Sequence, residues 1–238
     1  MRFQKKHFII PALLLGTSFI IYLLQFIIFN DSKDTFFYLF QDLAFLPISM
    51  LLVSLILDKM ISDREKREKL EKMNMVIGVF FSEIGSELVR QCSNFDTEYE
   101  INKHKLCVTS KWTASDFDNA AALVKKHNFN INSKKASFDT LKSLLMVKRS
   151  FLLNLLGNPV LLEHDTFSDL LWSIFHIIDE LSIRDKLENL SDEDYSHLSV
   201  DIDRMYGLLI YQWILYIKHV KNDYPYLFNL ALKQHPYM

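Results

Sequence analysis

The sequence predicts an all-α protein with an N-terminal two-helix transmembrane hairpin, a helical stalk and a cytoplasmic α-helical bundle. Half of its 238 residues are hydrophobic, yet Gly and Pro number only five each, which argues against disorder and against a turn-rich β-sandwich. Two long stretches near the N-terminus are almost free of charge. The long segments that follow repeat apolar residues at helical spacing, and none alternates as strands do.

The charge balance and the cysteine content exclude two classes of protein. The formal net charge is -2, so there is no basic field for nucleic acid and we expect no direct sequence-specific nucleic-acid binding. Two cysteines cannot make a disulfide framework.

Residues 8–29 form the first predicted transmembrane helix. These 22 residues carry no charge, and at a rise of 1.5 Å per residue they cover a hydrocarbon core of about 30 Å. A signal peptide is the alternative, since basic residues precede the stretch. Its apolar part is too long for that, and no cleavage motif with small residues follows. We therefore expect a retained anchor.

Residues 36–57 form the second predicted span, and its opening aromatic residues are typical of a membrane–water boundary. Residues 30–35 leave room only for a tight turn between antiparallel helices. Basic residues precede the first span and follow the second, whereas the turn holds one Lys against two Asp. By the positive-inside rule, both termini face the cytoplasm. We expect the membrane to be a bacterial inner membrane. Cys92 and Cys107 are then expected to be free thiols.

Asp42 lies inside the second span and has two interpretations. A carboxylate at the membrane midplane costs about 3 kcal/mol or more and would face a bundle interior or a water-filled path. Alternatively, Asp42 lies close enough to the outer boundary to be hydrated.

Residues 59–90 are predicted to continue the second span as a stalk and the first helix of the bundle. Acidic residues in the run 62–72 precede basic ones by four positions, which supports a helix. Apolar residues then recur at helical spacing from Met73 to Leu88. A parallel coiled coil between copies is the alternative, but positions 62–69 offer no apolar seam.

Residues 91–238 are predicted to form the cytoplasmic helical domain. Residues 91–113 show no sustained period and are interpreted as a connection, with a short strand-like piece around Leu106–Val108. Residues 128–135 are interpreted as a polar loop. Helix starts are predicted from capping residues at Ser115, Ser137, Thr166 and Ser191, and a last helix is expected at Tyr226–Gln234.

No phosphate-binding glycine loop, dinucleotide fingerprint or nucleophile elbow occurs in the chain. His164-Asp165 is similar to the metal-binding pair of HD-type phosphohydrolases. That family also needs an upstream His, for which His104 and His127 are available, and a downstream Asp, for which Asp179 and Asp201 are available. The Gly-Lys that commonly follows the pair is Thr-Phe here. The alternative is a polar helix N-terminus whose carboxylates are favoured by the helix dipole.

Two pairs of polar residues are spaced so that each pair shares one helix face. His176 and Asp179, with Glu180 beside them, resemble the carboxylate–histidine pairs of di-metal bundles, and His197 with Asp201 could supply a second pair. The alternative is an ordinary hydrogen-bonded His, and we favour it. Cys92, His104 and Cys107 lack the spacing and the fourth ligand of a zinc site. We therefore expect no metal and no cofactor.

Residues 158–172 (NPVLLEHDTFSDLLW) and 224–231 (YPYLFNLA) resemble a widespread group of uncharacterised prokaryotic proteins. The resemblance is best over residues 140–238 and implies a two-span anchor with a helical cytoplasmic domain. It implies no catalytic residues. The architecture is also similar to that of two-span effectors of bacterial phage-defence systems, including retron-associated ones, which act on the inner membrane.

The expected function is therefore that of a membrane effector and not of an enzyme. The cytoplasmic domain would sense a signal or be restrained by a protein or ribonucleoprotein partner, and the hairpin would self-associate to perturb the bilayer. A passive anchor for a cytoplasmic complex is the first alternative, and a metal-dependent phosphohydrolase is the second.

Overall fold

The computed structural model describes residues 16–24, 26–27, 32–162, 164–184 and 187–233. Within these residues the secondary structure is helical, and a single antiparallel bridge between Asp96 and Ile131 is the only extended pairing. The all-α prediction is therefore confirmed. The chain divides into two compact units, Met1–Lys66 and Arg67–Met238.

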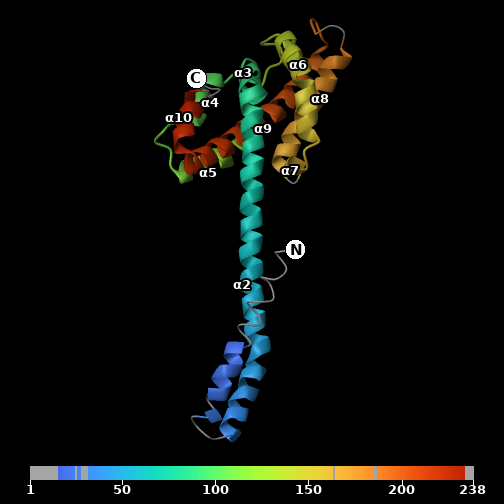
Figure 1. Cartoon of the computed structure of the whole chain (residues 1–238). Coiled ribbons are helices and arrows are strands. Elements are labelled where there is room, and N and C mark those ends of the chain that lie inside the picture. Colours follow the sequence, from blue (N-terminus) through green and yellow to red (C-terminus); the bar gives the residue numbers. More distant parts are fainter. Residues whose placement is uncertain (1–15, 25, 28–31, 163, 185–186, 234–238) are drawn as a thin grey trace. The chain divides into compact units, whose positions relative to one another are not determined.

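The first unit contains a short helical segment and the first part of α2 (Ser32–Phe80). Residues 16–24 and 26–27 are helical and lie alongside α2 within this unit (Figure 1). The remainder of the predicted first span lies outside the described residues. The second predicted span falls entirely within α2, which continues through Pro47.

The predicted continuation of the second span through the charged run is also confirmed, because α2 ends only at Phe80. A π-helical turn, Phe81–Gly85, follows it and leads into α3 (Ser86–Ser93). The sequence pattern did not predict this turn. Phe80 and Phe81, the consecutive residues at its start, are both buried in the core. The ring of Phe80 lies 5.3 Å from that of Phe167, and the ring of Phe81 lies 5.1 Å from that of Trp213.

Seven more helices follow among the described residues. They are α4 (Tyr99–Leu106), α5 (Ala114–Val124), α6 (Phe138–Leu156), α7 (Pro159–Leu162), α8 (Asp165–Ile183), α9 (Asp192–Asp223) and α10 (Pro225–Lys233). Helix α9 is the centre of the second unit and packs against α3, α5, α8 and α10, while α6 and α7 pack on α8.

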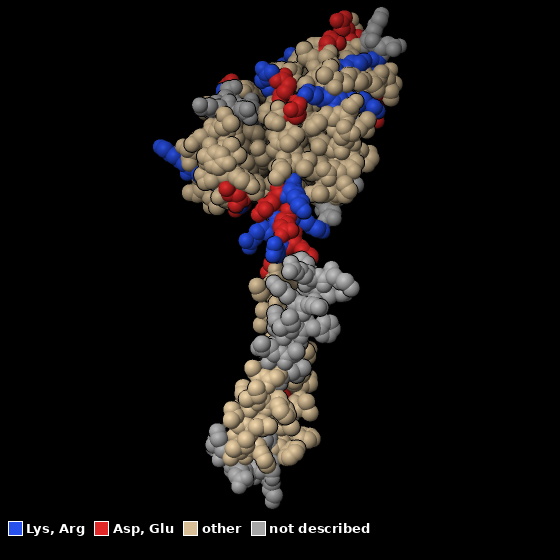
Figure 2. Space-filling model, in the orientation of Figure 1, with Lys and Arg blue, Asp and Glu red and all other residues tan. Residues whose placement is uncertain are grey.

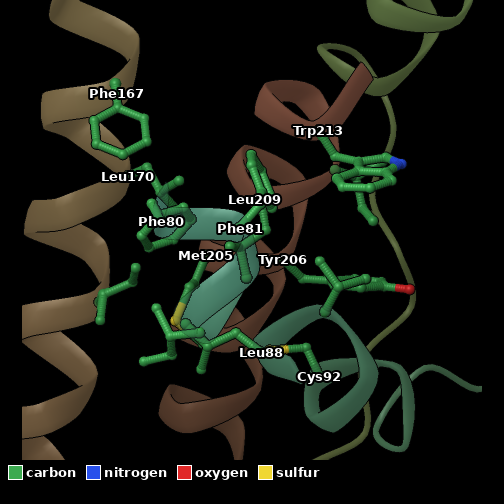
Figure 3. Packing of buried hydrophobic residues seen from close by; sticks show 14 of the residues in the cluster. Phe80, Phe81, Leu88, Cys92, Phe167, Leu170, Met205, Tyr206, Leu209 and Trp213 are labelled. Atoms are coloured by element: carbon green, nitrogen blue, oxygen red, sulfur yellow. The ribbon is translucent and has the colours of Figure 1, made fainter. Parts of the chain in front are cut away.

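The core of the second unit forms where α8 and α9 meet the π-helical turn and α3. Figure 3 shows Phe80 and Phe81 between Phe167 and Leu170 of α8 and Leu209 and Trp213 of α9. All six side chains are buried. Burial of large apolar side chains is the main stabilising contribution here, at roughly 1.5–3 kcal/mol for each one.

The interpretation of residues 91–113 as an irregular connection was partly wrong, whereas residues 128–135 form a loop as predicted. The expected strand-like piece at Leu106–Val108 is instead the end of α4 and the extended residues after it. Helix α4 was missed because its exposed face is polar and its turns bury only Asn102 and Leu106. The loop at 128–135 is not simply polar, since Phe129 is fully buried and its N–H donates to Asp203 at 2.7 Å.

Two of the four predicted helix caps are correct. Ser137 caps α6 and Ser191 caps α9. The cap of α5 is Thr113, not Ser115, because Thr113 and Asp116 form a complete capping box. The cap of α8 is His164, not Thr166. A histidine nitrogen performs the role that sequence rules assign to hydroxyl and carboxylate oxygens.

Candidate functional site

The second unit brings four of the predicted polar residues together on the facing sides of α8 and α9. His176 and Glu180 lie one turn apart on α8, and His197 and Asp201 lie one turn apart on α9. The i,i+4 spacing places the two members of each pair on the same helix face. Packing of α8 against α9 then makes two local pairs into a single group of four.

The two imidazoles converge on one carboxylate oxygen. Nε2 of His176 and Nε2 of His197 each lie 3.2 Å from Oδ2 of Asp201. Nε2 of His197 also lies 3.8 Å from Oε1 of Glu180. One nitrogen or oxygen from each of His176, Glu180 and His197 lies within 4.8 Å of the other two. No other group of three or more His, Cys, Asp or Glu residues among those that the structure describes is arranged in this way.

The carboxylate of Asp201 is enclosed, while the two rings beside it are open to solvent. The Asp201 side chain is 12% exposed, and those of His176 and His197 are 49% and 52% exposed. Oδ2 of Asp201 is buried and accepts no hydrogen bond from the described residues. A buried carboxylate oxygen without a donor is costly. The group is therefore not an ordinary hydrogen-bonded His–Asp pair.

Arg184 holds Glu180 from the other side. Its guanidinium donates to Oε2 and to the main-chain carbonyl of Glu180, and it also donates to Asp194 at 3.0 Å. The hydrogen bond from Arg184 lowers the pKa of Glu180, against the opposing effect of burial. Glu180 is thus ionised at neutral pH, with Oε2 engaged and Oε1 directed at His197.

Asp179 does not join this group. The sequence interpretation paired His176 with Asp179 at i,i+3, but the side chain of Asp179 is exposed and the structure uses Glu180 at i,i+4. An i,i+3 and an i,i+4 neighbour lie on either side of the same helical position. Spacing alone could not decide between the two carboxylates, and the position of α9 decides it.

His164 and Asp165 lie at the start of α8 and serve to cap it. Nδ1 of His164 accepts from the N–H of Phe167 at 3.2 Å, and burial lowers the pKa of this histidine. Asp165 occupies the first turn, where the helix dipole favours a carboxylate. This geometry corresponds to the polar N-terminus that was the alternative to an HD-type pair.

The further ligands considered for such a site are not gathered around His164. His127 contacts Asn102 at 3.0 Å and lies edge-on against Phe129, and His104 is exposed on α4. Cys92 is buried in the core, and burial raises the pKa of its thiol. The described residues therefore form no HD-type ligand set and no Cys–His–Cys zinc site.

Asp42 has a partner within the first unit. The hydroxyl of Tyr22, on the first helical segment, donates to Oδ2 of Asp42 on α2 at 2.8 Å. This bond links the two helices of the unit and gives the carboxylate a donor other than water. Sequence reasoning did not single out Tyr22, and the signal that could have found it was a lone polar ring in an otherwise apolar stretch.

Comparison with known proteins gives two family matches and one close relative. Residues 69–233 match the family described as the C-terminal helical domain of the uncharacterized protein MJ1433, and residues 2–61 match the N-terminal helical domain of the same protein. MJ1433 of Methanocaldococcus jannaschii is 40% identical over 235 residues, covering 98% of this chain and 94% of the relative. No solved structure matches. The chain therefore belongs to the MJ1433 family of helical proteins.

Proposed function

We propose that this chain is a two-span protein of the cytoplasmic membrane, with both termini and the helical domain in the cytoplasm. In this proposal the domain senses a signal or is restrained by a partner, and the hairpin, assembled from several copies, acts on the bilayer. The observation that carries the proposal is the apolar, exposed surface of the first part of α2.

The exposed apolar side chains of α2 are too many for a water-soluble surface. Large hydrophobic residues from Phe36 to Ile61 are exposed over 40% or more of their area, and α2 contains a window long and apolar enough to cross a membrane. Soluble monomers rarely expose apolar patches larger than a few hundred Å². Lipid is the environment that suits this surface.

The charges of α2 support the proposed orientation. The apolar part of the helix is followed by a run of acidic and basic residues at 58–72, which Figure 2 shows as a mixed red and blue band. This run holds most of the basic residues near the predicted spans, and positive charge flanking a span favours the cytoplasmic side. The last turns of α2, including Met73, Ile77 and Phe80, are buried in the second unit. The same helix therefore serves both the anchor and the domain.

The bond between Tyr22 and Asp42 supports a paired hairpin. In hydrocarbon an unpaired carboxylate is expensive, and polar groups of membrane helices usually face neighbouring helices. Two helices cannot enclose a water-filled path, so action on the membrane requires several copies. Asp42 is then the residue proposed to line such a path.

Membrane extraction tests the anchor. After lysis and an alkaline carbonate wash, the full-length chain should remain in the membrane pellet and should enter solution only with detergent. Recovery of the chain in the carbonate supernatant would contradict a spanning anchor.

Membrane potential separates an effector from a passive scaffold, the alternative role. Graded expression of the full chain, followed with a voltage-sensitive dye, should depolarise cells above a threshold level if copies assemble. Asp42→Asn keeps an acceptor for Tyr22 but removes the charge, and it should abolish depolarisation. Asp58→Asn, at the end of the apolar part of α2, is the matched control and should behave like the wild type. An unchanged potential at every expression level would favour the scaffold.

A role in phage defence is the most specific part of the proposal and rests on the likeness in architecture to two-span effectors. Phage challenge of cells that carry the chain with its native gene neighbours tests it. Depolarisation before lysis, lost in Asp42→Asn, is the expected result. Equal phage yields with and without the chain would contradict a defence role.

A further inference from the structure

We propose that His176, Glu180, His197 and Asp201 bind one divalent transition-metal ion, Zn²⁺ being the best fit, and that this ion joins α8 to α9. The sequence alone led us to expect no metal, because each His–carboxylate pair has an ordinary explanation when it is considered separately. When the four side chains are considered together, an ordinary hydrogen-bonded pair does not explain them, because Oδ2 of Asp201 accepts no hydrogen bond from the described residues.

The chemistry of the four side chains selects the ion. Imidazole nitrogens together with carboxylate oxygens are zinc ligands, whereas Mg²⁺ and Ca²⁺ prefer sites made only of oxygen. Imidazole nitrogen also suits iron, nickel and copper. Two neutral imidazoles and two carboxylates would neutralise the charge of a divalent cation.

Two distances, those from Asp201 to the two histidines, agree with a tetrahedral site. With metal–ligand bonds of about 2.0–2.1 Å, the ligand atoms of a tetrahedral zinc ion lie about 3.3–3.4 Å apart. Oδ2 of Asp201 lies 3.2 Å from Nε2 of His176 and 3.2 Å from Nε2 of His197. Oε1 of Glu180 lies 3.8 Å from Nε2 of His197, so it would have to move closer to join the other three atoms around one ion.

The unsatisfied oxygen of Asp201 points to the same ion. Both ring nitrogens approach it closely, yet neither forms a hydrogen bond with it. A cation between the three atoms would satisfy the buried oxygen and would use the lone pairs of both nitrogens. The half-exposed rings of His176 and His197 provide the route by which an ion enters.

Arg184 is the positioning residue of this site. It binds Oε2 of Glu180 and is itself tied to Asp194, so Oε1 of Glu180 is held toward His197. Outer partners of this kind orient the ligands of protein metal sites. Four protein ligands leave no open position for water or substrate, which is the pattern of structural and not of catalytic zinc sites. The ion is therefore expected to stabilise the packing of α8 on α9.

Zinc binding by the full-length chain in detergent tests the proposal. After removal of metal with a chelator, equilibrium dialysis against Zn²⁺ and elemental analysis should give one ion per chain, and the ion should raise the midpoint of thermal unfolding. His176→Gln/His197→Gln should abolish both effects. Arg184→Gln should weaken zinc binding by about 10–100-fold without abolishing it.

His219→Gln is the matched control. His219 and Asp223 form another His–carboxylate pair at i,i+4 on α9, with Nδ1 and Oδ2 2.6 Å apart, but no third ligand joins them among the described residues. This variant should bind zinc as the wild type does. Far-UV circular dichroism checks that every variant is folded. We expect the double variant to fold, because the side chains of His176 and His197 are half exposed.

Co²⁺ provides a second readout that depends on geometry. Substitution by Co²⁺ should give the intense visible absorption of a tetrahedral site, and the double variant should lack it. Zinc stoichiometry equal in the wild type and the double variant would overturn the proposal. A weak, octahedral Co²⁺ spectrum would overturn the closed four-ligand site.

Discussion

The two units of the chain use the same apolar side chains in opposite ways. In the first unit Phe40 exposes 72% of its area, whereas in the second unit Phe80 and Phe167 expose none. The hydrophobicity of a single side chain therefore does not say whether that side chain is exposed or buried in a protein core. The distribution of charge supplies the difference: the second unit has a polar face on each amphipathic helix, and the apolar part of α2 has none.

Truncating one aromatic ring in each unit should give the largest contrast. Phe167→Ala removes a fully buried ring that packs against Phe80, and it should lower the free energy of unfolding of the second unit by about 3–5 kcal/mol. Phe40→Ala should leave that free energy unchanged. Chemical denaturation of the full chain in detergent, followed by near-ultraviolet circular dichroism, measures both. Equal losses in the two variants would show that the ring of Phe40 is also buried in a protein core.

Adding one methyl group at two glycines tests the packing of the π-helical turn. A Cβ on Gly85 would lie 2.6 Å from the ring of Phe81 and 2.7 Å from that of Phe80, both fixed in the core. Gly85→Ala should therefore destabilise the second unit by about 1–3 kcal/mol. Gly207→Ala is the control, because its Cβ meets only Phe129 at 3.7 Å.

Helix propensity favours alanine at position 207 by up to about 1 kcal/mol, so Gly207→Ala should be neutral or stabilising. The midpoints of thermal unfolding of the two variants test both expectations. A Gly85→Ala protein as stable as the wild type would mean that the two rings do not enclose this glycine.

The cap of α8 should make the stability of the second unit depend on pH. Burial lowers the pKa of His164 from its ordinary value of 6.5, so the unfolded chain binds this proton more readily than the folded chain. The contribution of His164 is fully present above pH 6.5 and is lost as the pH falls through its folded pKa. The free energy of unfolding should therefore decrease below pH 6.5.

His164→Asn keeps a capping acceptor that does not titrate. The difference in unfolding free energy between wild type and variant should change between pH 7.5 and pH 5 in the variant's favour. A difference that is constant across this range would contradict a buried, neutral His164.

Patterns within one helix could be predicted from the sequence, and arrangements between helices could not. The caps at Ser137 and Ser191 and the continuation of α2 through the charged run follow from local rules. The π-helical turn could not be foreseen, because its aromatic contacts, to Phe167 and Trp213, lie on two distant helices. A histidine at a helix cap is outside the usual set of capping residues.

In the candidate site, too, the sequence predicted positions within each helix but not the arrangement between helices. All four of its residues were named from their spacing in the sequence, but Asp179 was given as the partner of His176, with Glu180 only beside it. Only the approach of α9 shows that His197 lies against Glu180 and that Asp201 lies against His176. Spacing identifies ligands that share a helix face, and it contains no information on which faces meet.

The topology of the anchor is the central claim, and cysteine accessibility in intact spheroplasts tests it most directly. Ser32→Cys places a thiol between the two predicted spans, and the native Cys107, partly exposed in the second unit, is the internal control. A membrane-impermeant maleimide should label the cysteine at position 32 at once and Cys107 only after permeabilisation. Labelling of Cys107 in intact spheroplasts, or protection of position 32 until the membrane is opened, would contradict the account.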